Sequence, residues 1–367
     1  AAVSTEWKGY HVNVIDTPGH VDFNIEVNRS LRVLDGAVAV FDGVAGVEPQ
    51  TETNWRLADQ YVVPRMCYIN KMDRIGANFA HCVKGIRERL GATVVMCQVP
   101  LGSQDEFVGM VDLVAGAAYV WDSNDKDSQW EVIPLDQVRS RFKFVVTRDD
   151  EYLDNLQKMR DEMIETALAM DDDAFMHYVE TGEFDLAKLK ECIRTGTVAG
   201  KLVPVLCGSS FKNKGVQQLL DAVVDYLPYP GENGGMSMVD EDGNVIGKQE
   251  VRDDAPIRAL AFKVINDQFG TLTFTRIYSG VIKKGDTLMN VTRGKKERVG
   301  RIVEVQANTT KDIDEARAGD IVAFPTDTVY GLGALAFNHN AIESIYTAKN
   351  RPVEKAIPIL IGDLSDL

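Results

Sequence analysis

The first hundred residues alternate short apolar runs with segments of helical periodicity. Three runs end at a polar residue: residues 12–15 at Asp16, residues 38–41 at Asp42 and residues 66–69 at Asn70. Between them, residues 23–34 and 79–90 place apolar side chains at the spacing of one helical face. Strand and helix in alternation predict an α/β fold with a parallel sheet covered by helices. A later apolar run, Val203 to Cys207, is predicted to join this sheet.

The pattern changes twice after residue 100. A charged stretch with a helical pattern through Leu153, Leu156, Met163 and Ala167 predicts an inserted subdomain. A stretch rich in Pro, Gly and acidic residues predicts a linker, and the short β-rich segments after it predict a small barrel. The predicted parts are a sheet domain at 1–100 and 201–228, an inserted α+β subdomain at 101–200, a linker at 229–254, an incomplete β-barrel at 255–320 and a short α/β segment at 321–367.

The composition excludes several classes of protein. With 45% hydrophobic residues, the chain is typical of globular proteins rather than disordered ones. It contains no run of about 18 apolar residues, which a membrane-spanning helix would need. A net charge of −15 disfavours non-specific binding to nucleic acid. Five scattered cysteines without a CxxC pair argue against a disulfide framework or a zinc site and indicate a reducing compartment.

The segment from Asp16 to His20 follows the first apolar run and reads Asp-Thr-Pro-Gly-His. Asp16 is suited to hold Mg²⁺ through a water molecule, because magnesium keeps much of its hydration shell. Gly19 lets its backbone N–H approach a γ-phosphate without a side chain in the way. His20 would orient an attacking water. The alternative is structural: Pro18 and Gly19 form a turn, and Asp22 caps the next helix.

The segment from Asn70 to Asp73 follows the third apolar run and reads Asn-Lys-Met-Asp. The Asp73 carboxylate can accept hydrogen bonds from the ring N–H and the exocyclic amine of guanine, a donor pair that adenine lacks. Asn70 can bond the base and the loop, and the stem of Lys71 can cover one face of the ring. The alternative is an ordinary polar turn. Because the carboxyl ends of parallel strands share one edge, we expect both motifs in one site.

A phosphate-binding loop is absent from the sequence. Such a loop reads Gly, four residues, then Gly-Lys-Ser or Gly-Lys-Thr, so that backbone N–H groups surround the phosphates. The three Gly-Lys pairs begin at Gly200, Gly247 and Gly294, and none is followed by Ser or Thr. Since Ala1 lies only fifteen residues before Asp16, we expect that the loop belongs upstream of this chain and was cut away.

Residues 9–79 and the segment Cys207 to Gly215 resemble elongation factor G, a family of translational GTPases. The resemblance covers residues 1 to about 320 and implies a ribosomal GTPase that moves tRNA and mRNA, with GTP or GDP and Mg²⁺ as ligands. It implies ribosomal RNA and proteins as partners, a cytoplasmic location, a monomer off the ribosome, and no membrane or DNA. It assigns the nucleotide site to Asp16, Thr17, Pro18, Gly19, His20, Asn70, Lys71, Asp73, Ser209 and Ser210, with Asp16 at Mg²⁺ through water and His20 in hydrolysis.

Three parts of that family have no counterpart in this sequence: the phosphate-binding loop with its strand, the switch region with its Thr, and the later domains. The sheet domain is therefore expected to be a truncated P-loop-type GTPase domain. Without the loop, phosphate binding and charge stabilisation in the transition state are lost. We expect weak or no GTP turnover by this chain.

From about Asp320 the sequence resembles a second family, the YrdC-like threonylcarbamoyl-AMP synthases. This family makes a tRNA-modification precursor from ATP, threonine and bicarbonate. The resemblance rests on the run from Ile321 to Gly333 and on Lys349 to Pro352. The alternative is a Gly-rich turn followed by a helix with a solvated basic end. The substrate-site residues that the resemblance implies are Thr326, Thr328, Lys349 and Arg351.

Both families share a Gly-Asp-Ile-Val-like stretch near Gly319 to Val322, which indicates a recombined or mis-joined coding sequence. We expect the strand around Val322 to Phe324 to pair with the open edge of the barrel. Two alternative functions stay open: a fragment of the synthase, and a non-catalytic chimera that keeps a guanine-binding loop. A basic cluster on one predicted hairpin is either a contact to ribosomal RNA or a solvated turn. It comprises Arg293, Lys295, Lys296, Arg298 and Arg301.

Overall fold

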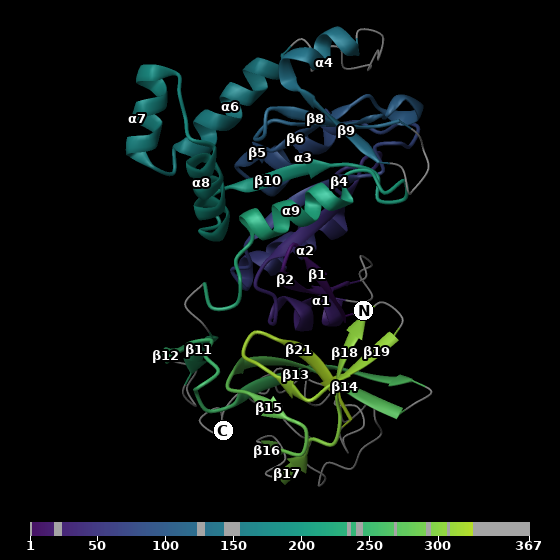
Figure 1. Cartoon of the computed structure of the whole chain (residues 1–367), viewed down its shortest axis with the longest axis vertical. Coiled ribbons are helices and arrows are strands. Elements are labelled where there is room, and N and C mark those ends of the chain that lie inside the picture. Colours follow the sequence, from purple (N-terminus) through teal and green to yellow (C-terminus); the bar gives the residue numbers. More distant parts are fainter. Residues whose placement is uncertain are drawn as a thin grey trace. The chain divides into compact units, whose positions relative to one another are not determined.

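The computed structural model describes residues 2–17, 24–122, 129–142, 155–232, 236–239, 245–267, 270–290, 295–306 and 309–325. The chain divides into two compact units, which are described separately (Figure 1). We call residues 18–229 the α/β unit. We call residues 1–17 together with residues 230–367 the β unit.

The centre of the α/β unit is a parallel sheet of β3 (Ala37–Asp42), β4 (Arg65–Asn70), β10 (Val203–Cys207) and β5 (Val94–Met96), in this order. The near-continuous apolar sequences of β4 and β10 fit central strands that are covered on both faces. The ladders place Asp42 opposite Asn70, and Cys207 opposite Ile69. The ends of three strands therefore meet at one edge, which confirms the predicted parallel sheet for these strands.

Helix ends in this unit follow local sequence signals. The helix α3 (Phe79–Leu90) begins after Asn78, whose side chain accepts a hydrogen bond from the His81 N–H, and ends at Gly91 in the left-handed conformation. Pro49 at the start of α2 (Pro49–Gln60) has the fixed φ that a first helical turn needs. The other helices around the parallel sheet are α1 (Asn24–Leu31), α8 (Leu186–Val198) and α9 (Val216–Tyr226).

The insertion after β5 adds a second sheet, which is antiparallel. Its strands are β6 (Gln98–Leu101), β7 (Gly109–Asp112), β8 (Ala117–Trp121) and β9 (Trp130–Pro134), in this order. Its helices are α4 (Leu135–Arg141), α6 (Leu156–Leu168) and α7 (Asp172–Thr181), with a 3₁₀ turn at Gln104–Glu106. Leu156, Met163 and Ala167 are buried on α6, as the helical pattern predicts. Val99 and Met110 belong to the same buried cluster as the parallel sheet, so the insertion shares its core.

The strand that precedes Asp16 lies outside the parallel sheet. The strand β2 (Tyr10–Ile15) pairs antiparallel with β1 (Ala2–Trp7), and both belong to the β unit. The prediction that this apolar run joins the parallel sheet is therefore wrong. The physical reason is local, because Lys8 and Gly9 have φ of 49° and 82°, as a two-residue type I′ turn requires. This turn of two residues joins β1 to β2, so β1 becomes the partner of β2.

The main sheet of the β unit is antiparallel. Its strands, in order, are β13 (Arg258–Asp267), β14 (Gly270–Ser279), β21 (Ile321–Phe324), β18 (Ile302–Gln306) and β19 (Thr309–Ile313). Three short pairs accompany it: β11 (Met236–Val239) with β12 (Val245–Gln249), β15 (Ile282–Lys283) with β20 (Glu315–Ala316), and β16 (Thr287–Asn290) with β17 (Lys295–Arg298). The short β-rich segments predicted to form the barrel include β13, β14, β16 and β18. The segment predicted as a linker contains the hairpin of β11 and β12.

The strand β21 closes the main sheet by lying between β14 and β18. It pairs with β14 from Ile321 opposite Arg276 to Phe324 opposite Thr273, and Ala323 also pairs with Val303 of β18. All four residues of β21 are buried. The strand pairs with barrel strands as expected, but it does so on both sides and lies inside the sheet rather than at an open edge.

The burial of β21 makes it testable by a core substitution. Val322 is 2% exposed and packs with Ile277 and Ile302. We expect Val322→Ala to lower the free energy of unfolding of the β unit by about 1–3 kcal/mol, through lost apolar contact and a residual cavity. Urea denaturation measures the change, and Met289→Ala at an exposed position is the matched control. Equal stability of the two variants, or fast amide exchange in residues 322–324, would contradict the assignment of β21.

Candidate functional site

Two loops come together where β4 and β10 end. We call residues 70–74 the base loop and residues 208–214 the serine loop. The N–H of Met72 donates to the carbonyl of Gly208 at 3.1 Å, and the N–H of Gly208 donates to the carbonyl of Ile69 at 3.0 Å. Because the two strands are parallel neighbours, these bonds extend their pairing into the loops. The loops therefore form one structure at the edge of the sheet.

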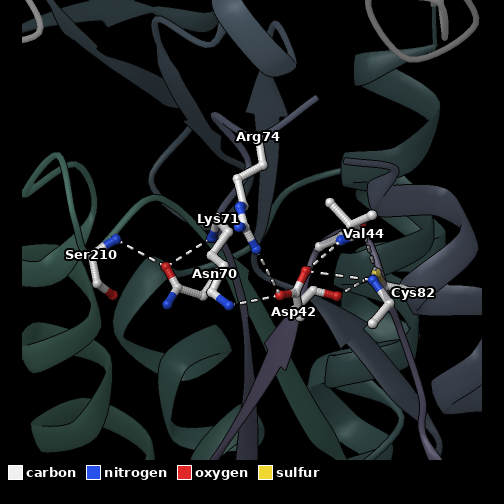
Figure 2. Close-up of polar contacts among 9 residues, drawn as sticks. Asp42, Val44, Asn70, Lys71, Arg74, Cys82 and Ser210 are labelled. Atoms are coloured by element: carbon white, nitrogen blue, oxygen red, sulfur yellow. Dashed lines mark hydrogen bonds and ion pairs between the residues drawn. The ribbon is translucent and has the colours of Figure 1, made fainter. Parts of the chain in front are cut away.

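The side chain of Asn70 joins the two loops (Figure 2). Its Oδ1 atom accepts hydrogen bonds from the N–H of Lys71 at 2.8 Å and from the N–H of Ser210 at 2.9 Å. The predicted contact of Asn70 with its loop is thus present, and it reaches the second loop as well. One oxygen holds both loops in register.

The serine loop is tightly packed behind this contact. Gly208 has no room for a side chain, because an added Cβ would lie 2.3 Å from Tyr68 Oη and 2.4 Å from the Lys214 carbonyl. Ser209 and Lys214 exchange backbone hydrogen bonds at 2.9 and 3.0 Å. Ser209 is buried and Ser210 is exposed, so the loop presents Ser210 at its surface. The loop has the rigidity that a recognition surface needs.

A buried ammonium group lies under the serine loop. Lys214 is 2% exposed, and its Nζ donates to the carbonyl of Phe107 at 3.2 Å. Burial lowers the pKa of Lys214, the charge of Lys212 acts in the same direction, and the charge of Asp73 opposes both. The half-buried carboxylate of Asp73 thus lies in the field of this lysine.

A second carboxylate faces the base loop from β3. Asp42 Oδ2 lies 2.7 Å from the ammonium nitrogen of Lys71 and 3.6 Å from a guanidinium nitrogen of Arg74. Its Oδ1 accepts the N–H of Val44 at 2.9 Å. Partial burial acts to raise the pKa of Asp42, but the hydrogen bond from Lys71 and the others hold it below its ordinary value. Asp42 is therefore ionised at neutral pH.

The structure brings together five of the predicted nucleotide-site residues: Asn70, Lys71, Asp73, Ser209 and Ser210. Asp16 and Thr17 follow β2 in the β unit. Seven predicted residues lie outside the described part of the chain: Pro18, Gly19, His20, Thr326, Thr328, Lys349 and Arg351. Sequence reasoning missed Asp42, Arg74 and Lys214. Asp42 could have been found, because it ends the strand that neighbours the one ending at Asn70.

The predicted basic cluster is partly present on the hairpin of β16 and β17. Lys296 and Arg298 are exposed two residues apart on β17, and Lys295 lies on the same strand. Arg301 is paired with Asp312 at 2.7 Å. Arg293 lies outside the described residues. The hairpin therefore presents two exposed cations on one face, and its role in binding RNA stays a prediction.

Other kinds of site are not found in the described residues. No group of three or more His, Cys, Asp or Glu side chains gathers there at a spacing that could hold a metal ion. All five cysteines are unpaired and buried. Among the described helices, none is both long and apolar enough to cross a bilayer.

Family models match three parts of the chain. Residues 1–229 match the elongation factor Tu GTP binding domain, and residues 270–328 match elongation factor Tu domain 2. Residues 314–367 match a family described as Telomere recombination, whose members include YrdC. The first match includes the base loop and the serine loop.

Proteins named elongation factor G are similar to most of the chain. That of Granulibacter bethesdensis is 48% identical over 328 residues, which are 88% of this chain and 46% of the relative. That of Orientia tsutsugamushi is 50% identical over 315 residues, which are 86% of this chain and 43% of the relative. The chain thus spans about half the length of these relatives.

A solved structure shares the fold. The crystal structure of a protein from Thermus thermophilus matches with a TM-score of 0.69 and 24% identity. The match covers 90% of this chain and 46% of that chain. At this level of identity, the likeness concerns the fold alone.

The bridge made by Asn70 can be tested by removing its oxygen. In Asn70→Ala, the N–H groups of Lys71 and Ser210 lose their acceptor, so we expect the α/β unit to lose about 1–3 kcal/mol of stability. Asn70→Asp keeps an oxygen at the same position and should lose less. Urea denaturation followed by tryptophan fluorescence compares the variants. If alanine and aspartate are equally destabilising, the bridge is not what holds the loops.

Proposed function

Because the chain belongs to the elongation factor Tu GTP binding domain family, we propose that it binds guanine nucleotides through the base loop and the serine loop. The observation that carries this proposal is the Asn70 oxygen, which joins the loop that contains Asp73 to the loop that contains Ser210. In this proposal the chain is part of a translational GTPase.

Guanine recognition is assigned to groups with different tasks. The Asp73 carboxylate accepts the ring N–H and the exocyclic amine, which selects guanine over adenine. Lys71 covers one face of the ring with its stem. The serine loop supplies Ser210 at the edge of the base, with the buried Ser209 behind it, where its hydroxyl accepts the N–H of Lys212. These assignments are supported by the half-burial of Asp73, because a partly desolvated carboxylate discriminates more strongly than an exposed one.

Phosphates and Mg²⁺ are assigned to the segment from Asp16 to His20. Asp16 would hold Mg²⁺ through water, Gly19 would meet the γ-phosphate, and His20 would orient the attacking water. The described residues of this segment, Asp16 and Thr17, offer a carboxylate and a hydroxyl, which fit Mg²⁺ that is held mainly by nucleotide oxygens and water. When bound, the ion neutralises phosphate charge. We also propose that these 367 residues hydrolyse GTP weakly or not at all. An assay of phosphate release from GTP tests this.

The proposal extends to partners by similarity. The relatives named elongation factor G support a role in translation, with the ribosome as partner. The exposed cations of β17 are the proposed contact to ribosomal RNA. We further propose a cytoplasmic monomer that binds neither membrane nor DNA.

A second candidate function rests on the match of residues 314–367. Under this proposal the segment derives from a threonylcarbamoyl-AMP synthase, with Thr326, Thr328, Lys349 and Arg351 at the substrate. Pyrophosphate release that requires ATP, threonine and bicarbonate together would support it. Release that is no faster than in buffer would leave the guanine site as the only proposed function.

Specificity for guanine can be redirected at one residue. In Asp73→Asn the side chain keeps one acceptor and gains a donor, which matches xanthine, where a carbonyl replaces the exocyclic amine. We expect GDP to bind about 10- to 100-fold more weakly and xanthosine diphosphate to bind more tightly than to the wild type. Isothermal titration calorimetry with GDP, xanthosine diphosphate and ADP measures this. Unchanged GDP affinity in Asp73→Asn would refute the assigned role of Asp73.

A further inference from the structure

Asp42 is placed to control the geometry of the base loop from a neighbouring strand. It is the last residue of β3 and lies directly opposite Asn70, the first residue of the base loop. Its carbonyl oxygen accepts two hydrogen bonds, from the N–H of Gly46 at 2.8 Å and from Cys82 Sγ at 3.8 Å. Burial, and to a lesser extent the charge of Asp42, raise the pKa of Cys82 to about 11, so this contact is made by a neutral thiol. The position of the carboxylate is therefore set by rigid structure.

The two oxygens of the Asp42 carboxylate have separate tasks (Figure 2). Oδ1 accepts the N–H groups of Val44 and Ala45 at 2.9 and 3.4 Å, which fixes the turn after β3. Oδ2 faces the cations of the base loop, Lys71 and Arg74. A substitution that keeps Oδ1 and removes the charge can therefore separate the turn from the ion pair.

Lys71 is held at both ends. Its backbone has φ of 63°, a left-handed conformation that few side chains adopt, and its N–H is bound to Asn70. Its ammonium group is bound to Asp42 at 2.7 Å. The stem between these points is tethered at both ends, while the side chain is 44% exposed and so accessible to a ligand. A free lysine stem would have to lose rotamer freedom when a ring packs on it, and this one has lost much of that freedom beforehand.

We propose that Asp42 is a positioning residue for guanine binding, which holds the ammonium group of Lys71 so that the lysine stem is already extended where the base packs. This inference rests on the proposed function of the base loop. It adds a residue from β3 to a site otherwise formed by the ends of β4 and β10. Asp42 does not touch the base and acts through Lys71.

Asp42→Asn in the full chain is the first test. The asparagine keeps an oxygen for Val44 and Ala45 and loses the charge that holds Lys71. We expect GDP affinity to fall about three- to fivefold by calorimetry, as for loss of a half-exposed ion pair. The matched control is Asp225→Asn, which breaks a Lys190–Asp225 pair of the same length, 2.7 Å, with similar exposure between α8 and α9. The control should bind GDP as the wild type does.

Two further readouts distinguish positioning from general stability. Lys71→Met keeps an apolar stem but removes the ammonium group, so adding Asp42→Asn to it should cause no additional loss of affinity. The side-chain ammonium signal of Lys71 in ¹⁵N NMR should broaden in Asp42→Asn and stay sharp in Asp225→Asn. Additive losses in the double variant, or tighter GDP binding by Asp42→Asn, would overturn the inference.

The same titrations separate this inference from the function on which it rests. If the wild-type chain binds GDP and ADP equally, guanine recognition and the role of Asp42 both fail. If it selects GDP, and Asp73→Asn loses this selectivity while Asp42→Asn matches the wild type, only the role of Asp42 fails.

Discussion

One hydrogen-bond acceptor, the side-chain oxygen of Asn70, determines how the candidate site is arranged. At the end of a strand, backbone N–H groups lose their ladder partners and need others. Asn70 provides one for its own loop and one for the serine loop, at 2.8 and 2.9 Å. The bond from Met72 to Gly208 ties the loops a second time, and Gly208 leaves no space for a side chain in between. The two loops are therefore tied to each other at two points.

The sequence predicted those strands whose apolar side chains are buried on both faces of the sheet. Runs such as Met66 to Ile69 and Val203 to Cys207 are apolar without alternation, which fits strands covered on both faces, and they form β4 and β10. The partner of β2 was not predictable from its apolar run. An apolar run does not specify which strand it pairs with, and here the positive φ values of Lys8 and Gly9 form a tight turn that favours β1. The hairpin of β11 and β12 was not predicted for a different reason, since Gly and acidic residues dominate the sequence around its two short strands.

The sequence predicted those residues of the candidate site that lie close together in one motif. Asn70, Lys71 and Asp73 follow one another, and the serine loop has its own local signature. Asp42 and Lys214 have no such signature. Asp42 reaches Lys71 because the register of β3 and β4 places it opposite Asn70, and register is a property of the sheet rather than of either strand. Lys214 became relevant only through its burial, which hydropathy does not indicate for a lysine.

The strand β21 shows how one short sequence can suit two domains. Residues 314–328 belong both to the match with elongation factor Tu domain 2 and to the match with the Telomere recombination family. The Ile-Val-Ala-Phe sequence is apolar on both faces, so it fits a covered strand in either setting. Its backbone groups, however, can serve only one pair of neighbours at a time. In this structure β14 and β18 occupy them, so β21 serves as a strand of the β unit.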